Sequence, residues 1–318
     1  MTRRLMVALA LFVSGAAAPL ASQAPFDRTV PPGLAAPPSL DLPQVRTASL
    51  PNGIELYVIP MHEVPVVQFS LSSAGGGRLD GAQPGLASFT AGMLSNGAGD
   101  RDAAAFAAEV AFLGANLESY ADWDAINVAL KTPVRTMEQT LDLMADVVLR
   151  PRFDAREVER QRDLRLADIL QRRDQPTTMA SLAFNALVFP AGHPYHTSLE
   201  GDSSSTARLD SATVRGFQER VMDPRRTRIV VAGDITLERA REELLERFGA
   251  WEPADTEAAG PPAAPAVSVP PTRIFLVDKP GAAQSVIAIG RPGIERSNPD
   301  YYAVEVMNTI LGGSFSSR

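Results

Sequence analysis

Cysteine is absent from this chain of 318 residues, and only three histidines occur in it. Without cysteine there can be no disulfide bond, no lipid attachment through sulfur and no thiolate chemistry, so a cysteine protease is excluded. Zinc in proteins is held by cysteine, histidine and carboxylate groups. A zinc site in this chain would therefore have to depend largely on carboxylates.

Basic runs are equally scarce, and the formal net charge is -7. Apart from Arg3-Arg4 the arginines are scattered, which disfavours a nucleic-acid partner. Hydrophobic residues make up 45% of the chain and charged residues 21%, a balance typical of a soluble globular protein. A chain of this length can bury a sizeable core in one large or two ordinary domains.

The N-terminal segment has a composition of its own. Arg3-Arg4 is followed by an apolar run at residues 5–13 and by small residues at 14–18. This order is typical of a secretory signal peptide, and the run is shorter than the roughly 20 residues of a membrane anchor. We expect residues 1–24 to be a signal peptide, although Pro19 leaves the exact cut open. The mature protein is then periplasmic in a Gram-negative bacterium, or secreted, with no membrane span.

Composition divides the rest of the chain into four parts. Residues 25–44 are rich in proline and predict an extended leader. Residues 45–251 alternate strand-like and helical patterns and predict a first domain. Residues 252–271 are rich in proline and alanine and predict a linker. Residues 272–318 are expected to start a second domain.

The second domain is expected to repeat the layout of the first. Residues 273–277 and 285–289 are strand-like, and residues 301–311 are helical before Gly312-Gly313. Strands followed by a helix near paired glycines also occur at residues 47–97, which indicates a second, incomplete copy of one fold.

A short helix at residues 85–96 is the centre of the first domain. Four apolar residues at helical spacing define its core face: Leu86, Phe89, Met93 and Leu94. Ser88, Ala91 and Gly92 are expected to lie close together on another face.

This helix resembles the zinc-binding helix of the M16 peptidases, the pitrilysin and insulinase family. In the family's motif H-x-x-E-H, two histidines bind zinc and the glutamate is the general base. The corresponding positions here are Ser88, Ala91 and Gly92, none of which carries a zinc donor of that kind. The family's third ligand is a glutamate on a later helix, and the same spacing leads to Asp168.

Other stretches support the resemblance in chain order. They are Phe153-Asp154, Glu159-Arg160-Gln161-Arg162-Asp163, Gly192-His193-Pro194-Tyr195 and Gly233-Asp234. The resemblance implies an α+β fold of the LuxS and metallopeptidase type: an antiparallel-rich mixed sheet covered by helices, in two homologous halves, the second truncated here. It also implies that an extended peptide substrate lies along an edge strand, at Asn116, Leu117, Glu118 and Ser119.

Three functions follow as hypotheses. The first is a non-catalytic subunit that binds peptide and pairs with an H-x-x-E-H partner, with zinc in the partner and no cofactor in this chain. The inactive chain of such a pair can supply an arginine and a tyrosine from its second half, which would lie beyond Arg318. The second hypothesis is a stand-alone peptide-binding or scaffold protein.

The third hypothesis is a zinc metalloendopeptidase with an atypical ligand set, for which the candidates are Glu118, Glu159 and Asp168. His193 and His196 are three residues apart, but Pro194 favours a turn rather than a helix between them, and no third ligand is evident. His62 lies in a polar turn and is expected at the surface.

Overall fold

The computed structural model describes residues 42–253, 263–268 and 271–314. The expected signal peptide lies outside these residues, as do nearly all of the expected leader and most of the expected linker. Residues from Pro43 onward form one unit. Within the described residues, no helix combines the length and apolar character needed to cross a membrane.

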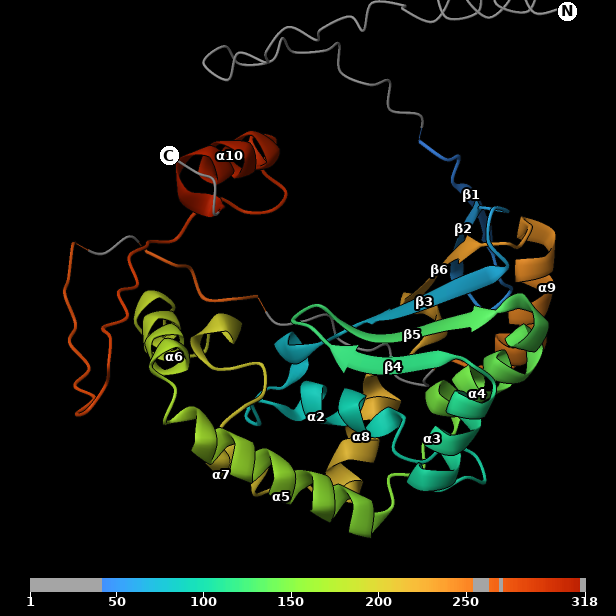
Figure 1. The fold of residues 1–318 in the computed structure, drawn as a ribbon, viewed down its shortest axis with the longest axis horizontal. Helices are drawn as coiled ribbons and strands as arrows, with labels where there is room; N and C mark the ends of the chain where they lie inside the picture. Colours follow the sequence, from blue (N-terminus) through green and yellow to red (C-terminus); the bar gives the residue numbers. More distant parts are fainter. Residues whose placement is uncertain (1–41, 254–262, 269–270, 315–318) are drawn as a thin grey trace, which may run out of the picture. The chain divides into compact units, whose positions relative to one another are not determined.

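Six strands of this unit form one mixed sheet in the order β1-β2-β6-β3-β5-β4 (Figure 1). Their bounds are β1 Arg46–Ser49, β2 Glu55–Pro60, β3 Val66–Ala74, β4 Asn116–Ala121, β5 Ala125–Pro133 and β6 Thr227–Gly233. The β2–β6 pair is parallel, and the other four pairs are antiparallel. The expected α+β class with a mixed, mostly antiparallel sheet is confirmed.

One face of the sheet is buried and the other is open. In β3 the side chains of Val67, Phe69 and Leu71 alternate with more exposed ones and are fully buried. In β6 Ile229 is fully buried, whereas the neighbouring Val230 is 40% exposed. This alternation is the pattern of strands that pack one face on a core.

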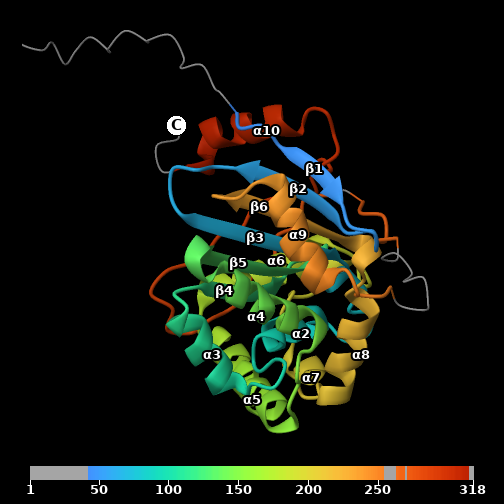
Figure 2. The same ribbon diagram turned by 90° about the vertical axis from the view of Figure 1, so that its right-hand side faces the viewer.

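Helices cover the buried face, but not all of the described helices take part. The bounds of the described helices are α2 Leu86–Leu94, α3 Ala103–Phe112, α4 Met137–Leu149, α5 Ala155–Arg172, α6 Pro176–Val188, α7 Ser203–Thr206, α8 Ser211–Val221, α9 Leu237–Phe248 and α10 Tyr301–Asn308, of which α6 and α10 have no buried residue. Helix α2 packs on β4 and β5, α4 on β5, and α9 on β1 and β2. Figures 1 and 2 both show α2, α3, α4 and α8 gathered on one side of the sheet.

Short polar side chains begin several of these helices. Asp102 accepts a hydrogen bond from the backbone N–H of Ala105 at the start of α3. Asp210 accepts from the N–H of Thr213 in the same way at the start of α8. Such caps satisfy backbone donors that have no partner within the helix.

The prediction of strands at residues 273–277 and 285–289 is wrong. Both segments are irregular, and Ile274, Leu276 and Ile289 are each 93% exposed. A strand needs a neighbour for its backbone hydrogen bonds, and neither segment belongs to the sheet described above. The expected helix does form, as α10 followed by one π-helical turn at Thr309–Gly313.

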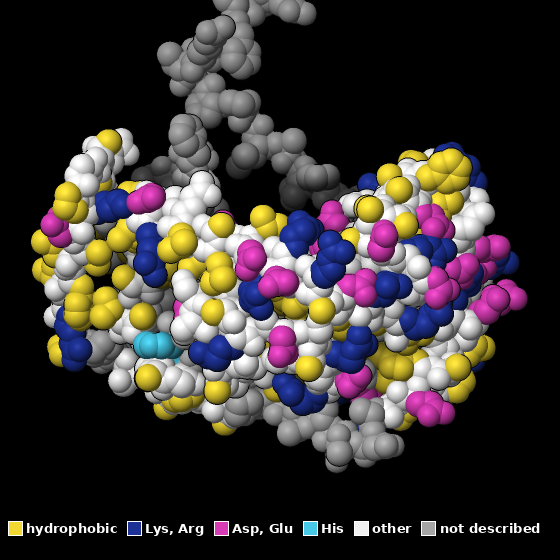
Figure 3. Space-filling view, turned by 90° about the horizontal axis from the view of Figure 1, so that it is seen from below, with side chains coloured by type: hydrophobic (Ala, Val, Ile, Leu, Met, Phe, Trp, Pro, Cys, Tyr) yellow, Lys and Arg dark blue, Asp and Glu magenta, His cyan; other side chains and the backbone are white. Residues whose placement is uncertain are grey.

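The face viewed in Figure 3 carries charged side chains of both signs, interspersed rather than grouped. Within α5, Arg160 forms an ion pair with Glu157 and Arg162 forms one with Glu159. Exposed pairs of this kind contribute little stability, from about 0 to 1 kcal/mol each. They do neutralise the positive charge of this arginine-rich helix.

The loop before α7 packs tightly against the residues that precede α2. Gly201 has φ +76°, and a Cβ atom there would lie 2.2 Å from the carbonyl oxygen of Pro84. We expect Gly201→Ala to lower the free energy of unfolding by about 2 kcal/mol more than Gly81→Ala. Gly81 is the matched control, because it has φ +59° but a Cβ atom added there would meet no heavy atom within 4 Å. Urea unfolding of both variants measures the difference, and equal effects would show that the loop gives way without cost.

Candidate functional site

The start of α2 is held by a carboxylate from the preceding turn. Gly85 stands at the N-cap with φ 93° and offers no side chain to cap the helix. Asp80 takes that role: its Oδ2 accepts from the N–H of Gly85 at 2.8 Å and its Oδ1 from that of Ala87 at 2.7 Å. Burial raises the pKa of Asp80 to about 6, although both hydrogen bonds favour the charged form.

The three motif positions on α2 differ in their surroundings. Ala91 is fully buried in the core with Phe89 and Met93. Ser88 is half-buried, whereas Gly92 is exposed. Ala91 therefore belongs to the core, and not to a face of α2 apart from the core as we expected, because the core face of this short helix extends round to it.

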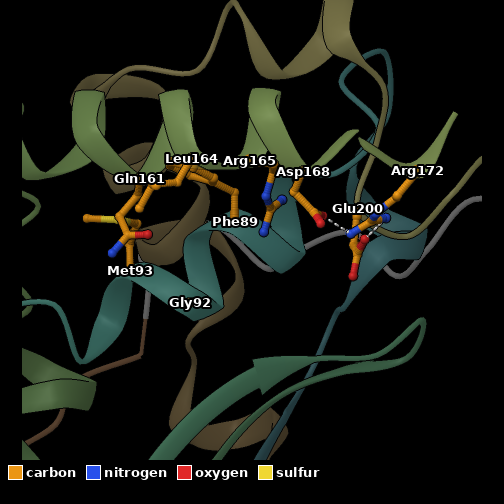
Figure 4. A pocket seen from close by; sticks show the side chains of 9 residues that line it. All are labelled: Phe89, Gly92, Met93, Gln161, Leu164, Arg165, Asp168, Arg172 and Glu200. Carbon is orange, nitrogen blue, oxygen red and sulfur yellow. Dashed lines mark hydrogen bonds and ion pairs between the residues drawn. The ribbon is translucent and has the colours of Figure 1, made fainter. Parts of the chain in front are cut away.

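A pocket of about 320 Å³ lies between α2 and α5 (Figure 4). Its lining residues come from three segments: Phe89, Gly92 and Met93 from α2; Gln161, Leu164, Arg165, Asp168 and Arg172 from α5; and Glu200 from the loop before α7. The fold thus brings Gly92 and Asp168 to one pocket, as the family resemblance implies. Ala91 does not line it.

Arg165 connects the two helices of this pocket. Its Nη1 donates to the hydroxyl oxygen of Ser88 at 2.9 Å and to the carbonyl oxygen of Gly85 at 3.2 Å. Its guanidinium lies over the ring of Phe89, 5.0 Å from the centroid, in a cation–π contact. Burial lowers the pKa of Arg165, so this charge is poorly solvated.

Asp168 is engaged by a neighbour on its own helix. Its Oδ2 pairs with the guanidinium of Arg172, which also pairs with Glu200. The three side chains lie together at one end of the pocket in Figure 4. Asp168 therefore has a cation as its partner, one turn along α5.

Zinc does not fit these residues. A serine hydroxyl, a buried alanine and a glycine supply none of the nitrogen, sulfur or carboxylate donors that zinc takes in proteins. The hydroxyl of Ser88 accepts a hydrogen bond from a cationic guanidinium, which disfavours a metal ion beside it. Across the part of the chain that the structure describes, no three His, Asp or Glu side chains are grouped to hold a metal.

The atypical ligand candidates lie apart in separate interactions. Glu118 is on β4 and accepts from the amide of Asn116 at 2.7 Å. Glu159 is exposed on α5 and pairs with Arg162 at 3.4 Å. With Asp168 bound to Arg172, the structure does not bring these three carboxylates together.

The histidines have local partners. His193 and His196 lie around the 3-10 turn Pro194–His196, the turn geometry that Pro194 predicts. The Nδ1 of His193 accepts from the N–H of Tyr195, and the Nδ1 of His196 lies 2.8 Å from the carbonyl oxygen of Phe189. His62 is at the surface as expected, with its Nδ1 2.7 Å from Asp234.

The expected edge strand is β4, which lies at one end of the sheet. Its residues from Asn116 to Ser119 alternate between exposed and half-buried. The hydroxyl of Ser119 lies 3.3 Å from that of Ser95, just after α2. The free edge of β4 is therefore close to the helix that carries the motif positions.

Sequence reasoning missed Arg165 as a site residue. It also missed the stripe in which Arg165 lies, at positions 161, 165, 168 and 172 of α5. These positions recur at intervals of three and four, so they share one helix face. The same periodicity count that finds apolar stripes would have found this polar one.

The fold is an α+β domain with a mixed sheet, and a pocket lies between two of its helices. Two family models match the chain: Insulinase (Peptidase family M16) at residues 62–192, and Peptidase M16 inactive domain at residues 208–318. The chain belongs to the M16 family.

Related sequences have low identity to this chain, but the alignments cover most of it. An uncharacterized zinc protease of Mycobacterium leprae is 26% identical over 85% of this chain and 60% of its own length. Cytochrome b-c1 complex subunit 1 of Bos taurus is 24% identical over 85% of this chain and 56% of its own. The chain thus spans about three fifths of the length of the curated relatives it matches.

Solved structures share the fold. A peptidase M16 inactive domain from Pseudomonas fluorescens has a TM-score of 0.76 and 26% identity, over 85% of this chain and 65% of its own. The periplasmic protease PqqL of Escherichia coli has a TM-score of 0.63 and 18% identity, over 74% of this chain and 26% of its own. The second likeness concerns the fold alone.

Proposed function

We propose that this chain is a non-catalytic M16 subunit that binds peptide and pairs with a zinc-bearing H-x-x-E-H partner in proteolysis. One observation carries the proposal: at the motif helix, the Ser88 hydroxyl is hydrogen-bonded to the guanidinium of Arg165, and Gly92 has no side chain. A centre of this kind cannot activate water as zinc does. Peptide cleavage then depends on a second protein.

The relatives support pairing. Cytochrome b-c1 complex subunit 1 is by its name one subunit of a larger complex, and a probable mitochondrial-processing peptidase subunit beta of Arabidopsis thaliana is 21% identical over 86% of this chain and 51% of its own length. We extend this subunit role to the present chain. Zinc belongs to the partner in this proposal, and this chain needs no cofactor.

Peptide binding is assigned to the edge of β4. An edge strand presents unpaired backbone N–H and C=O groups to which an extended peptide can add as a further strand. Asn116, Leu117, Glu118 and Ser119 supply that edge, and side chains of the peptide would alternate between the open face and the side where α2 lies. Substrate held there is close to the motif helix but meets no metal of this chain.

An exported location completes the proposal. The N-terminal segment has the composition of a secretory signal peptide, and one protein of the same fold is named a periplasmic protease. We place the mature protein in the periplasm or outside the cell.

The test is to capture the chain together with any partner and to compare the mixture with the chain alone. The chain is captured from the periplasm of its own organism, and zinc content and peptide cleavage are measured for the chain alone and for the captured mixture. We expect an H-x-x-E-H protein in the mixture, with cleavage and zinc only when it is present. Stoichiometric zinc and cleavage by the isolated chain would contradict the proposal, and capture of the chain alone without cleavage would favour a stand-alone peptide-binding protein.

A further inference from the structure

The pocket between α2 and α5 contains a cation without a direct counter-ion. None of the described carboxylates forms an ion pair with Arg165, whose hydrogen-bond acceptors are the neutral oxygens of Ser88 and Gly85. Both of these bonds come from Nη1. Arg165 lines the pocket, and the fork of a guanidinium matches the two oxygens of a carboxylate.

The other charges of the pocket are already engaged. Arg172 pairs with both Asp168 and Glu200, and the two oxygens of Asp80 accept from the backbone of Gly85 and Ala87. These three carboxylates favour the charged form of Arg165 electrostatically, but none of them is hydrogen-bonded to it. Arg165 therefore remains the group that an incoming anion can pair with.

The rest of the pocket lining is largely apolar. Phe89 and Met93 of α2 are nearly fully buried, while Leu164 of α5 is 53% exposed beside them. A volume of about 320 Å³ is at the small end of the range for ligand pockets. It suits one apolar side chain next to a charged group better than a long ligand.

We propose that this pocket binds the C-terminal residue of a peptide, with its carboxylate on Arg165 and an apolar side chain on Leu164, Phe89 and Met93. The pocket would be a second contact for the peptide, in addition to β4. The proposal rests on the proposed function in one respect, namely that the ligand is a peptide. Binding at the pocket needs neither zinc nor the partner.

The experiment measures binding to the whole chain by calorimetry, with acetyl-Ala-Ala-Ala-Leu as the probe and its C-terminal amide as the control. We expect the free acid to bind at least tenfold more tightly than the amide, because a hydrogen-bonded charge pair is lost in the amide. Arg165→Met should remove this preference, whereas Arg160→Met should keep it. Arg160 is the matched control, since it lies on the same helix but pairs with Glu157 outside the pocket.

A second pair of variants leaves Arg165 and its bonds in place. A Cβ atom at Gly92 would meet no heavy atom within 4 Å, so both Gly92→Asp and Gly92→Asn can be accommodated. The aspartate should weaken binding of the acid at least tenfold relative to the isosteric asparagine, because it offers Arg165 a carboxylate of the protein's own.

Each outcome decides the proposal. Equal affinity for acid and amide, or an acid preference that survives both Arg165→Met and Gly92→Asp, would overturn it. Octanoate binding more tightly than the peptide acid would overturn the peptide assignment in favour of a fatty acid. Because no partner is present, a failure here is distinct from a failure of the partner to copurify.

Discussion

Zinc uptake is expected from a variant that combines Ser88→His, Gly92→His and Asp168→Glu with Arg165→Leu, and far less from the same variant with Arg165 retained. The two imidazoles, one turn apart on α2, and a glutamate on α5 would restore three ligands of the usual kind. Ala91 is left unchanged because it is buried in the core, and the general base is not needed for binding.

Arg165 decides the size of the effect. Its Nη1 now lies 2.9 Å from the hydroxyl of Ser88, so a metal bound at that position would meet a positive charge. Two unit charges about 4 Å apart near a protein surface interact by about 4 kcal/mol. Removing Arg165 should therefore tighten zinc binding at least about a hundredfold.

Competition with a chelating dye measures both zinc affinities. Arg160→Leu in the three-ligand background is the control, because it removes an arginine of the same helix that does not line the pocket. If circular dichroism shows that the variant without Arg165 is folded but it takes up no zinc, the assignment of positions 88, 92 and 168 to the metal site is contradicted.

Replacing Asp80 by asparagine should remove a pH-dependent contribution to the free energy of unfolding. Between low and neutral pH this contribution changes by up to about 3 kcal/mol. Burial raises the pKa of Asp80 from 3.8 to about 6 in the folded chain. A raised pKa means that the folded state binds the proton more tightly than the unfolded state. The stabilisation is complete below pH 3.8 and is lost as the pH rises through 6.

Urea unfolding of both proteins at about pH 4 and about pH 7 checks this expectation. The wild-type chain should gain stability relative to Asp80→Asn on going to the lower pH. All other titrating groups are common to both proteins, so the difference between them isolates Asp80. A difference that does not change with pH, or that changes in the opposite direction, would show that the carboxylate is solvated and that its hydrogen bonds to Gly85 and Ala87 dominate.

Local patterns in the sequence were sufficient for most of the fold. The helical spacing of Leu86, Phe89, Met93 and Leu94 predicted α2, and the helical pattern at residues 301–311 predicted α10, because both depend on residues near in sequence. The strands expected at residues 273–277 and 285–289 failed for the opposite reason. A strand forms only against a neighbour, and local propensity does not provide one.

At the site, the sequence by itself determined which donors are missing: the chain has no cysteine, its three histidines lie outside α2, and Ser88, Ala91 and Gly92 on α2 carry no imidazole, thiol or carboxylate. The tertiary structure alone decided what is there instead. Arg165 is distant from Ser88 along the chain, and their hydrogen bond exists because the fold brings α5 beside α2. The fold also buries Ala91 in the core, pairs Arg172 with Glu200 from another segment, and leaves Arg165 with neutral hydrogen-bond acceptors, since burial and charge compensation depend on neighbours that only the folded chain supplies.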